Sequence, residues 1–212
     1  MKDVLKIVEK HSLWIRWTHW INFPVLTAMI WSGMLIYWAH QAYPPFFPKG
    51  FFQILNADGN LAEGMALHFT LAWFFTLNGI AYGGYLLLSG SWRELIPNLT
   101  ALKNIVPVML HEIGLRKIGP PQTGKFNPAQ QIAYLSVSVM GMLSVLTGLV
   151  IYKPVQLHGL TRLLGGYETA RLIHFVLTLS YVGFFVVHVT QVIRAGWNNF
   201  RSMVSGFEVH KK

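Results

Sequence analysis

Four long apolar runs constrain this chain more than any other feature. They cover about residues 17–38, 66–88, 129–152 and 172–194, and none contains Asp or Glu. A helix of roughly 20 apolar residues crosses the bilayer's hydrocarbon core, so each run is long enough to span it. Only 12% of the residues are charged, against about 25% in a soluble domain. The sequence predicts an all-α integral membrane protein, a single four-helix bundle domain over residues 1–212.

Lys and Arg residues are distributed unevenly around these runs. Most of them precede the first run, follow the fourth, or lie between the second and the third. Because cytoplasmic loops of membrane proteins are enriched in Lys and Arg, both termini are expected in the cytoplasm. The net charge of +9 does not indicate a nucleic-acid partner, since the basic residues form no stripe on a polar face. The mixed stretch 99–113 is expected to form a helix on the inner membrane surface.

The chain contains no cysteine, which excludes disulfides, cysteine-ligated zinc, iron–sulfur clusters and covalent haem attachment. A metal centre would therefore need His, Met, carboxylate or backbone ligands. Polar residues inside a bilayer are costly and usually functional. The histidines inside the apolar runs or at their ends are His19, His68, His174 and His188.

These four histidines sort into two levels of the membrane. Because successive spans run in opposite directions, His68 and His174 are expected near the outer face, and His19 and His188 near the cytoplasmic face. His174 and His188 are fourteen residues apart, so they share one helix face and stand about 21 Å apart. A flat macrocycle at each level could be held by two imidazoles from different helices. Two axial imidazoles suit electron transfer better than oxygen binding, so the pattern predicts two non-covalent b-type haems with bis-His ligation.

Other interpretations of these residues remain open at this stage. A helix-end histidine is more often interfacial or hydrogen-bonded than a metal ligand, and a histidine-based metal or proton transporter would also place polar groups in the membrane. Arg16 and Arg171 each precede a histidine by three residues and are candidates for contacts with haem propionates, although Arg16 could equally be an inner-face anchor. Gly33, Gly141 and Gly148 could admit a macrocycle or a neighbouring helix.

Five segments carry a resemblance to a known family: RWTHW at 16–20, GMALH at 64–68, GKFNPAQ at 124–130, TGLVIYKP at 147–154 and RLIH at 171–174. With them the chain resembles the bacterial cytochrome b561 and nickel–iron hydrogenase b-type cytochrome family. That family includes formate dehydrogenase gamma subunits and the thiosulfate reductase cytochrome b subunit. The resemblance implies a bacterial inner (plasma) membrane protein in which His19 and His188 hold the cytoplasmic-side haem, and His68 and His174 the outer haem.

The resemblance also implies a quinone site and a partner. Segment 124–130 is similar to the family's quinone-binding turn, which would place Asn127, Ala129 and Gln130 near the quinone head group. An Asn before a Pro is also what a helix N-cap requires, so that interpretation stays open. The segment 152–168 and the C-terminal end look most like a branch that accompanies molybdopterin oxidoreductases. This implies an outer-face partner subunit that docks near 41–58 and 155–167.

The predicted function is that of an electron-transfer subunit rather than a catalytic one. It would carry electrons between a partner oxidoreductase on the outer face and the membrane quinone pool. A stand-alone quinone oxidoreductase that acts on a small oxidant such as superoxide is the alternative within redox chemistry. The histidine-based transporter is the alternative outside it.

Overall fold

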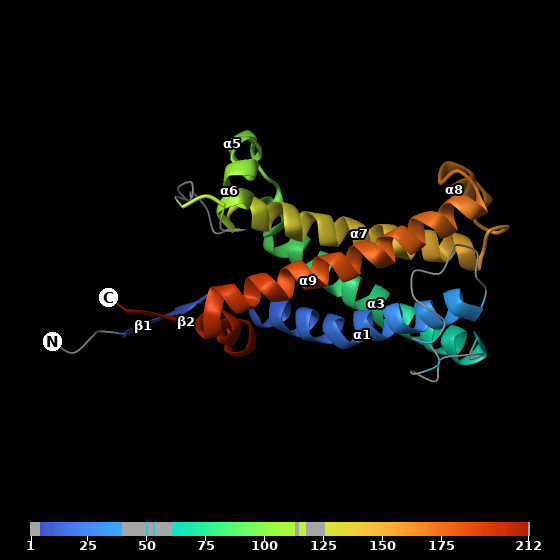
Figure 1. The fold of residues 1–212 in the computed structure, drawn as a ribbon, viewed down its shortest axis with the longest axis horizontal. Helices are drawn as coiled ribbons and strands as arrows, with labels where there is room; N and C mark the ends of the chain where they lie inside the picture. The colour runs from blue at the N-terminus through green and yellow to red at the C-terminus, as the bar shows by residue number, and fades with distance from the viewer. Residues whose placement is uncertain are drawn as a thin grey trace. The chain divides into compact units, whose positions relative to one another are not determined.

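Long helices dominate the computed structural model of the chain, which describes residues 5–39, 50, 53, 61–112, 115–117 and 126–211. Within these residues, four helices are long and apolar enough to cross a membrane (Figure 1). Each contains one of the predicted apolar runs, which confirms the all-α membrane architecture. The four helices are α1 (Leu13–Ala39), α3 (Leu61–Ser89), α7 (Pro128–Tyr152) and α9 (Tyr167–Ser205).

Large apolar side chains cover the outsides of these helices. Trp73 is 71% exposed, Leu88 92% and Ile193 73%. Exposing an apolar side chain of this size to water costs about 1.5–3 kcal/mol relative to burying it. Lipid removes that cost, while the helical backbone satisfies its own hydrogen bonds inside the bilayer. The exposed surface therefore fits a multi-pass membrane protein.

The chain divides into two compact units, and the divisions between them fall inside α3 and α9. The first unit consists of Met1–Tyr82 and Val186–Lys212, and the second of Gly83–Phe185. The first unit thus contains α1, most of α3 and the last part of α9. The second contains α7 and the first part of α9, together with the short helices between the spans.

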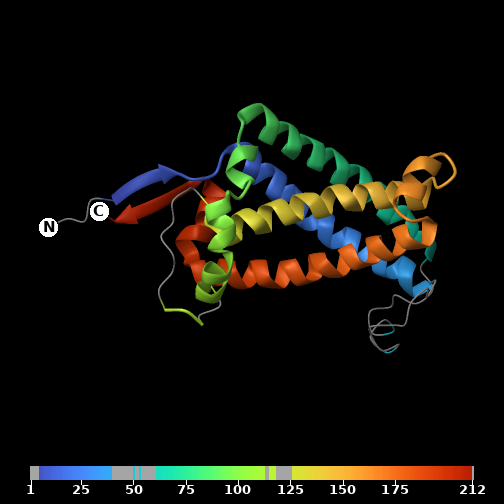
Figure 2. The ribbon, with the colours of Figure 1, turned by 90° about the horizontal axis from the view of Figure 1, so that it is seen from above.

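A two-stranded sheet in the first unit joins the two ends of the chain, and the sequence did not predict it. Strand β1 (Leu5–Glu9) pairs antiparallel with β2 (Phe207–Lys211) (Figure 2). Helix α9 is interrupted at Gly196, whose φ of 81° is a backbone conformation that glycine adopts at little cost. We call β1, β2 and the segment 197–205 the terminal clasp.

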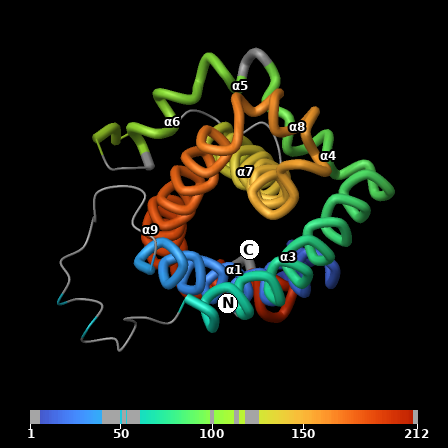
Figure 3. The backbone as a smooth tube through the Cα atoms, turned by 90° about the vertical axis from the view of Figure 1, so that its right-hand side faces the viewer, coloured from blue at the N-terminus to red at the C-terminus, as the bar shows by residue number. Residues whose placement is uncertain are grey.

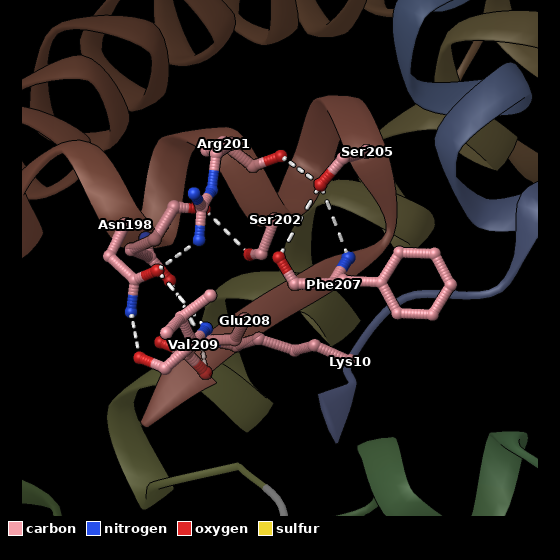
Figure 4. A network of polar contacts seen from close by, with 9 residues as sticks. Lys10, Asn198, Arg201, Ser202, Ser205, Phe207, Glu208 and Val209 are labelled. Carbon is pink, nitrogen blue, oxygen red and sulfur yellow. Dashed lines mark hydrogen bonds and ion pairs between the residues drawn. The ribbon is translucent and has the colours of Figure 1, made fainter. Parts of the chain in front are cut away.

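Polar contacts hold the terminal clasp together (Figure 4). Lys10 Nζ donates to Asn199 Oδ1 at 2.8 Å and lies 3.1 Å from Glu208 Oε2. The side chain of Asn198 bonds the backbone of Val209 in both directions, at 2.9 and 3.2 Å. Both terminal segments therefore lie at the same end of the first unit, as two termini on one side of a membrane would require. Which side that is remains a prediction.

A close approach between α1 and α3 sets the position of His68 in the first unit. A methyl group at Gly64 would lie 2.9 Å from Leu35 Cβ and 3.3 Å from the carbonyl oxygen of Ser32. Contacts this short are not tolerated, so only glycine lets the start of α3 lie against α1 in this way. His68 lies one helical turn further along α3, where it meets Ser32.

Short helices flank α7 in the second unit. They are α4 (Trp92–Leu95), α5 (Leu99–Lys103), α6 (Ile105–Glu112) and α8 (His158–Leu163). Helix α6 lies beside α7 (Figure 3), and α8 packs near the C-terminal end of α7. The stretch 99–113 forms two helices with a turn at Asn104 instead of the single predicted helix. Pro107 explains part of this, because proline is best placed in the first turn of a new helix. Residue 113 lies outside the described residues.

Candidate functional site

His19 and His188 lie together in the first unit. His19 is near the start of α1 and His188 is on α9, and their ring centroids are 6.1 Å apart with the ring planes at 55°. Two imidazoles bound to one metal ion from opposite sides, each through a bond of about 2 Å, have centroids roughly 6 Å apart. The two histidines predicted for the inner level are therefore brought together at a separation that suits a shared iron.

The ring of His19 is held by packing. It contacts the Trp20 ring edge-on, with the centroids 5.2 Å apart. Its Nδ1 is buried and has no hydrogen-bond partner among the described residues. A buried nitrogen left unpaired costs about 1–3 kcal/mol, and ligation of a metal through Nε2 would leave that cost in place. The fit to a haem therefore rests on the 6.1 Å separation of the His19 and His188 rings.

His68 is oriented by a serine on the neighbouring helix. Its Nδ1 lies 3.0 Å from Oγ of Ser32, which is fully buried on α1. Ser32 Oγ also donates to the carbonyl oxygen of Met29 at 3.0 Å. Because a hydroxyl has one proton and a carbonyl can only accept, Ser32 accepts the proton of His68 Nδ1–H. We infer the tautomer with its lone pair on Nε2, which is the form that ligates a metal.

His174 in the second unit has the same arrangement. Its Nδ1 lies 2.8 Å from Oγ1 of Thr147, which is fully buried on α7. Thr147 Oγ1 donates to the carbonyl oxygen of Leu143 at 2.7 Å. The same reasoning therefore assigns the proton of His174 to Nδ1 and the lone pair to Nε2.

A glycine follows each of the two hydroxyl residues. A methyl at Gly33 would lie 3.4 Å from Cε1 of His68, and one at Gly148 would lie 3.5 Å from Cε1 of His174. Both distances are ordinary van der Waals contacts, so each imidazole lies directly against the backbone of another helix. A histidine ring of another helix lies beside each of these two glycines at a distance that would still admit a methyl group, and the approach of a macrocycle at Gly33, Gly141 and Gly148 stays a prediction.

The two histidines predicted to share the outer haem lie in different units of the chain. His68 belongs to the first unit and His174 to the second, and a haem shared by them remains a prediction. Helix α9 is uninterrupted between His174 and His188, because its non-helical residue is Gly196. The fourteen-residue spacing used to predict two levels therefore lies within one helix.

Both candidate propionate ligands have partners within the chain. Arg16 Nη1 donates to the carbonyl oxygen of Val204 at 2.8 Å, while its Nε is buried without a hydrogen bond in the described part of the chain. Arg171 pairs with Glu168 at 3.2 Å, and the Glu168 side chain is 75% exposed. An exposed pair of this kind contributes about 1 kcal/mol or less, so an anionic ligand could replace it. The propionate contacts stay predictions.

The residues proposed for quinone form a helix cap. Asn127 Oδ1 accepts from the backbone N–H of Gln130 at 2.8 Å, and Gln130 Oε1 accepts from the backbone N–H of Asn127 at 3.0 Å. The N-cap interpretation of Asn127 is thus confirmed, whereas the quinone contacts of Asn127, Ala129 and Gln130 stay predictions. Positions 124 and 125 lie outside the described residues, as does the docking stretch 41–58 apart from positions 50 and 53.

Three side chains at this site were missed by the sequence reasoning. Ser32 and Thr147 were overlooked, although each directly precedes a glycine that the sequence marks as a point of close approach. Tyr181 is the third: it is 5% exposed and lies seven residues from both His174 and His188. That spacing of two helical turns is the signal that could have found it.

Comparison with known proteins agrees with this geometry. A family model described as prokaryotic cytochrome b561 matches residues 10–206, a range that contains all four histidines. A protein of Azospira oryzae, provisionally named protein-methionine-sulfoxide reductase subunit YedZ1, is 34% identical over 188 residues. The match covers 88% of this chain and 91% of that protein. The chain therefore belongs to the prokaryotic cytochrome b561 family, membrane proteins that bind b-type haem and transfer electrons.

Proposed function

We propose that this cytochrome holds two b-type haems and transfers electrons between the quinone pool on the cytoplasmic side and a partner oxidoreductase on the outer face. The observation that carries the proposal is the His19–His188 pair, whose ring centroids are 6.1 Å apart. His68 and His174 support it, because in the tautomer that we infer for both rings Nδ1–H donates to a hydroxyl and the lone pair is on Nε2. A bound b-type haem supplies reversible one-electron iron chemistry.

The four histidines determine what kind of redox chemistry is possible. In each predicted pair, two imidazoles from different helices would hold one haem iron between them. They would thereby keep small molecules away from the metal and favour electron transfer. No carboxylate stands in the four apolar runs, so the imidazoles would supply the iron's protein ligands without an added negative charge.

Haem content tests this assignment directly. The wild-type protein is expected to contain two haems per chain, measured by reduced-minus-oxidised absorbance and by haem-to-protein ratio. His19→Ala should lose one haem and His68→Ala the other, while each variant keeps the remaining one. His158→Ala, which alters an exposed histidine on α8, is the matched control and should keep both. Loss of no haem in either ligand variant would contradict the assignment.

Quinone would react at the start of α7. A quinone carbonyl can only accept hydrogen bonds, and the amide oxygens of Asn127 and Gln130 already accept from the backbone. The amide N–H groups of these side chains are therefore the donors that would reach the quinone. Ala129 lies between them and adds little bulk.

A substitution of Asn127 that keeps the helix N-cap tests its contact with quinone separately. Serine is as good an N-cap residue as asparagine but has no amide N–H group. Asn127→Ser should leave the spectra and the thermal unfolding midpoint unchanged while slowing haem reduction by an added quinol. An unchanged rate of quinol-driven reduction would remove Asn127 from the quinone site.

The Azospira relative, whose name assigns it to a protein-methionine-sulfoxide reductase, supports a proposal for the partner and for the direction of electron flow. We propose a partner of the same kind, of the molybdopterin type expected from the sequence, with electrons passing outward from quinol. The tagged chain should copurify from its native membranes with a soluble subunit. Methionine sulfoxide should then reoxidise the quinol-reduced haems of that complex. Reoxidation by superoxide, with no subunit retained, would favour the stand-alone oxidoreductase instead.

A further inference from the structure

The outer histidines share an arrangement that repeats on two different pairs of helices. On α1 a serine and then a glycine face His68, and on α7 a threonine and then a glycine face His174. Both hydroxyl residues are 0% exposed. The two sets lie in different units of the chain, so neither arrangement is a by-product of the other.

We propose that Ser32 and Thr147 are positioning residues that set the reduction potential of the outer haem through the Nδ1–H groups of His68 and His174. The inference rests on the proposed ligation of that haem by these two histidines. Each hydroxyl acts as an acceptor because its own proton goes to a carbonyl of its own helix. Neither hydroxyl can turn round to donate to the ring without losing that bond.

The expected direction of the effect follows from electrostatics. A hydrogen bond from Nδ1–H to an oxygen draws the proton away from the ring and makes Nε2 a better electron donor. A stronger donor stabilises the more positively charged, oxidised iron. The two hydroxyls therefore hold the potential of the outer haem below the value it would otherwise have, and removing either should raise it.

Potentiometric titration of the purified protein tests this, with the haem absorbance followed as the potential is varied. Removing the hydrogen-bond partner of a metal-bound histidine typically lowers metal affinity or activity 10- to 100-fold. In Ser32→Ala and in Thr147→Val, one of the two midpoints should move positive. We expect roughly a tenfold change in the reduction equilibrium, which is about 59 mV for a one-electron couple. The other midpoint should stay where it is.

Two sets of controls separate the hydroxyl's role from packing. Ser32→Thr and Thr147→Ser keep a hydroxyl and should restore the wild-type midpoint. Thr27→Val on α1 and Ser138→Ala on α7 remove hydroxyls that make the same bond to a carbonyl of their own helix, to Phe23 and to Tyr134 respectively. These two variants should leave both midpoints unchanged. In a His19→Ala background the outer haem alone should remain, which identifies the haem that shifts.

Each outcome decides between the alternatives. Loss of the outer haem in Ser32→Ala or Thr147→Val, with retention in the hydroxyl-keeping variants, also supports the positioning role. Unchanged midpoints in a protein that still contains both haems, or loss of the outer haem in Ser32→Thr and Thr147→Ser as well, overturns it. A wild-type protein without two haems would instead refute the proposed function, so the two failures are distinguishable.

Discussion

The histidines predicted for the inner level of this cytochrome and those predicted for the outer level are held in different ways. At the predicted outer level, Nδ1 of each ring lies within 3.0 Å of the fully buried hydroxyl oxygen of a neighbouring helix. At the inner level, His19 Nδ1 has no hydrogen bond in the described part of the chain, and its ring packs against Trp20 and His188. Hydrogen bonds therefore orient the rings of His68 and His174, whereas packing against neighbouring rings orients His19.

The two arrangements differ because the spans and the chain ends offer different hydrogen-bond partners. The usual partner of a ligating histidine is a carboxylate, a carbonyl or water, but an intramembrane carboxylate is costly, and the four apolar runs contain none. A serine or threonine whose proton is already bound to its own helix provides a neutral acceptor at little cost. Near the chain ends a polar structure is available instead, and the terminal clasp binds the start of α1. Trp20 Nε1 donates to the carbonyl oxygen of Met203 at 3.0 Å, and Arg16 to that of Val204.

The largest effect is expected from replacing the two histidines of α9 one at a time. His174→Ala and His188→Ala alter the same helix at the two predicted levels. Any difference between the two variants therefore comes from the level of the substitution and not from the helix. Each should halve the haem content, and the two remaining haems should differ in absorbance and midpoint potential. Identical spectra for the two single-haem proteins would mean that the levels are not distinct.

The second-largest effect is expected at Gly64. A methyl there would lie 2.9 Å from Leu35 Cβ, so Gly64→Ala should force α3 away from α1 at the level of His68 and Ser32. Overpacking of this kind costs about 1–3 kcal/mol. The outer haem should be released at a lower temperature than the inner one in thermal unfolding followed by absorbance. Gly79→Ala on the same helix meets nothing within 4 Å, and the melting of that variant should match or exceed the wild type.

A smaller effect on the inner level is expected from Trp20. Trp20→Phe keeps an aromatic ring beside His19 and Phe200 but removes the N–H group that donates to Met203. The loss should be about 0.5–1.5 kcal/mol, seen as earlier release of the inner haem on heating. Trp73→Phe, at a position 71% exposed on α3, serves as the control. Earlier release of the outer haem alone in Trp20→Phe would show that the clasp does not support the inner level.

The smallest effect is expected from Lys10, which holds the terminal clasp through Asn199 and Glu208. Lys10→Met should cost about 1 kcal/mol or less, because the pair is partly exposed and is screened by salt. Amide hydrogen exchange in β1 and β2 should become faster in the variant at low salt, and the difference should shrink as salt is added. Lys6→Met alters an exposed residue of the same strand and should change exchange little. Equal exchange in the Lys10 variant and the wild type at low salt would remove the ion pair from the clasp.

Much of the fold was predictable from the sequence because a bilayer restricts the choices. Four apolar runs without carboxylates can only become spanning helices, and the positions of the histidines along them already indicated two levels. The terminal clasp could not be predicted in the same way. FEVHK at 207–211 alternates apolar and polar residues over its first four positions, and LKIVE at 5–9 does so over its first three. Nothing local shows, however, that strands at opposite ends of a chain pair with each other.

The details of the site were predictable only in part. Gly33 and Gly148 stood out as small residues in membrane helices, yet the residue types that approach them depend on how the helices pack. The serine and threonine before them look like ordinary helix hydroxyls, because any Ser or Thr in a helix can bond the carbonyl one turn back. Only the structure shows that two of them also accept from a histidine.

The haem content and spin state of the wild-type protein test the two-level arrangement most directly. The measurement is a haem-to-protein ratio on chain purified from haem-replete cells, combined with low-temperature electron paramagnetic resonance of the oxidised sample. Two haems per chain, both low-spin as two axial imidazoles require, is the predicted result. A single haem, a high-spin iron with an open axial position, or colourless protein would contradict it.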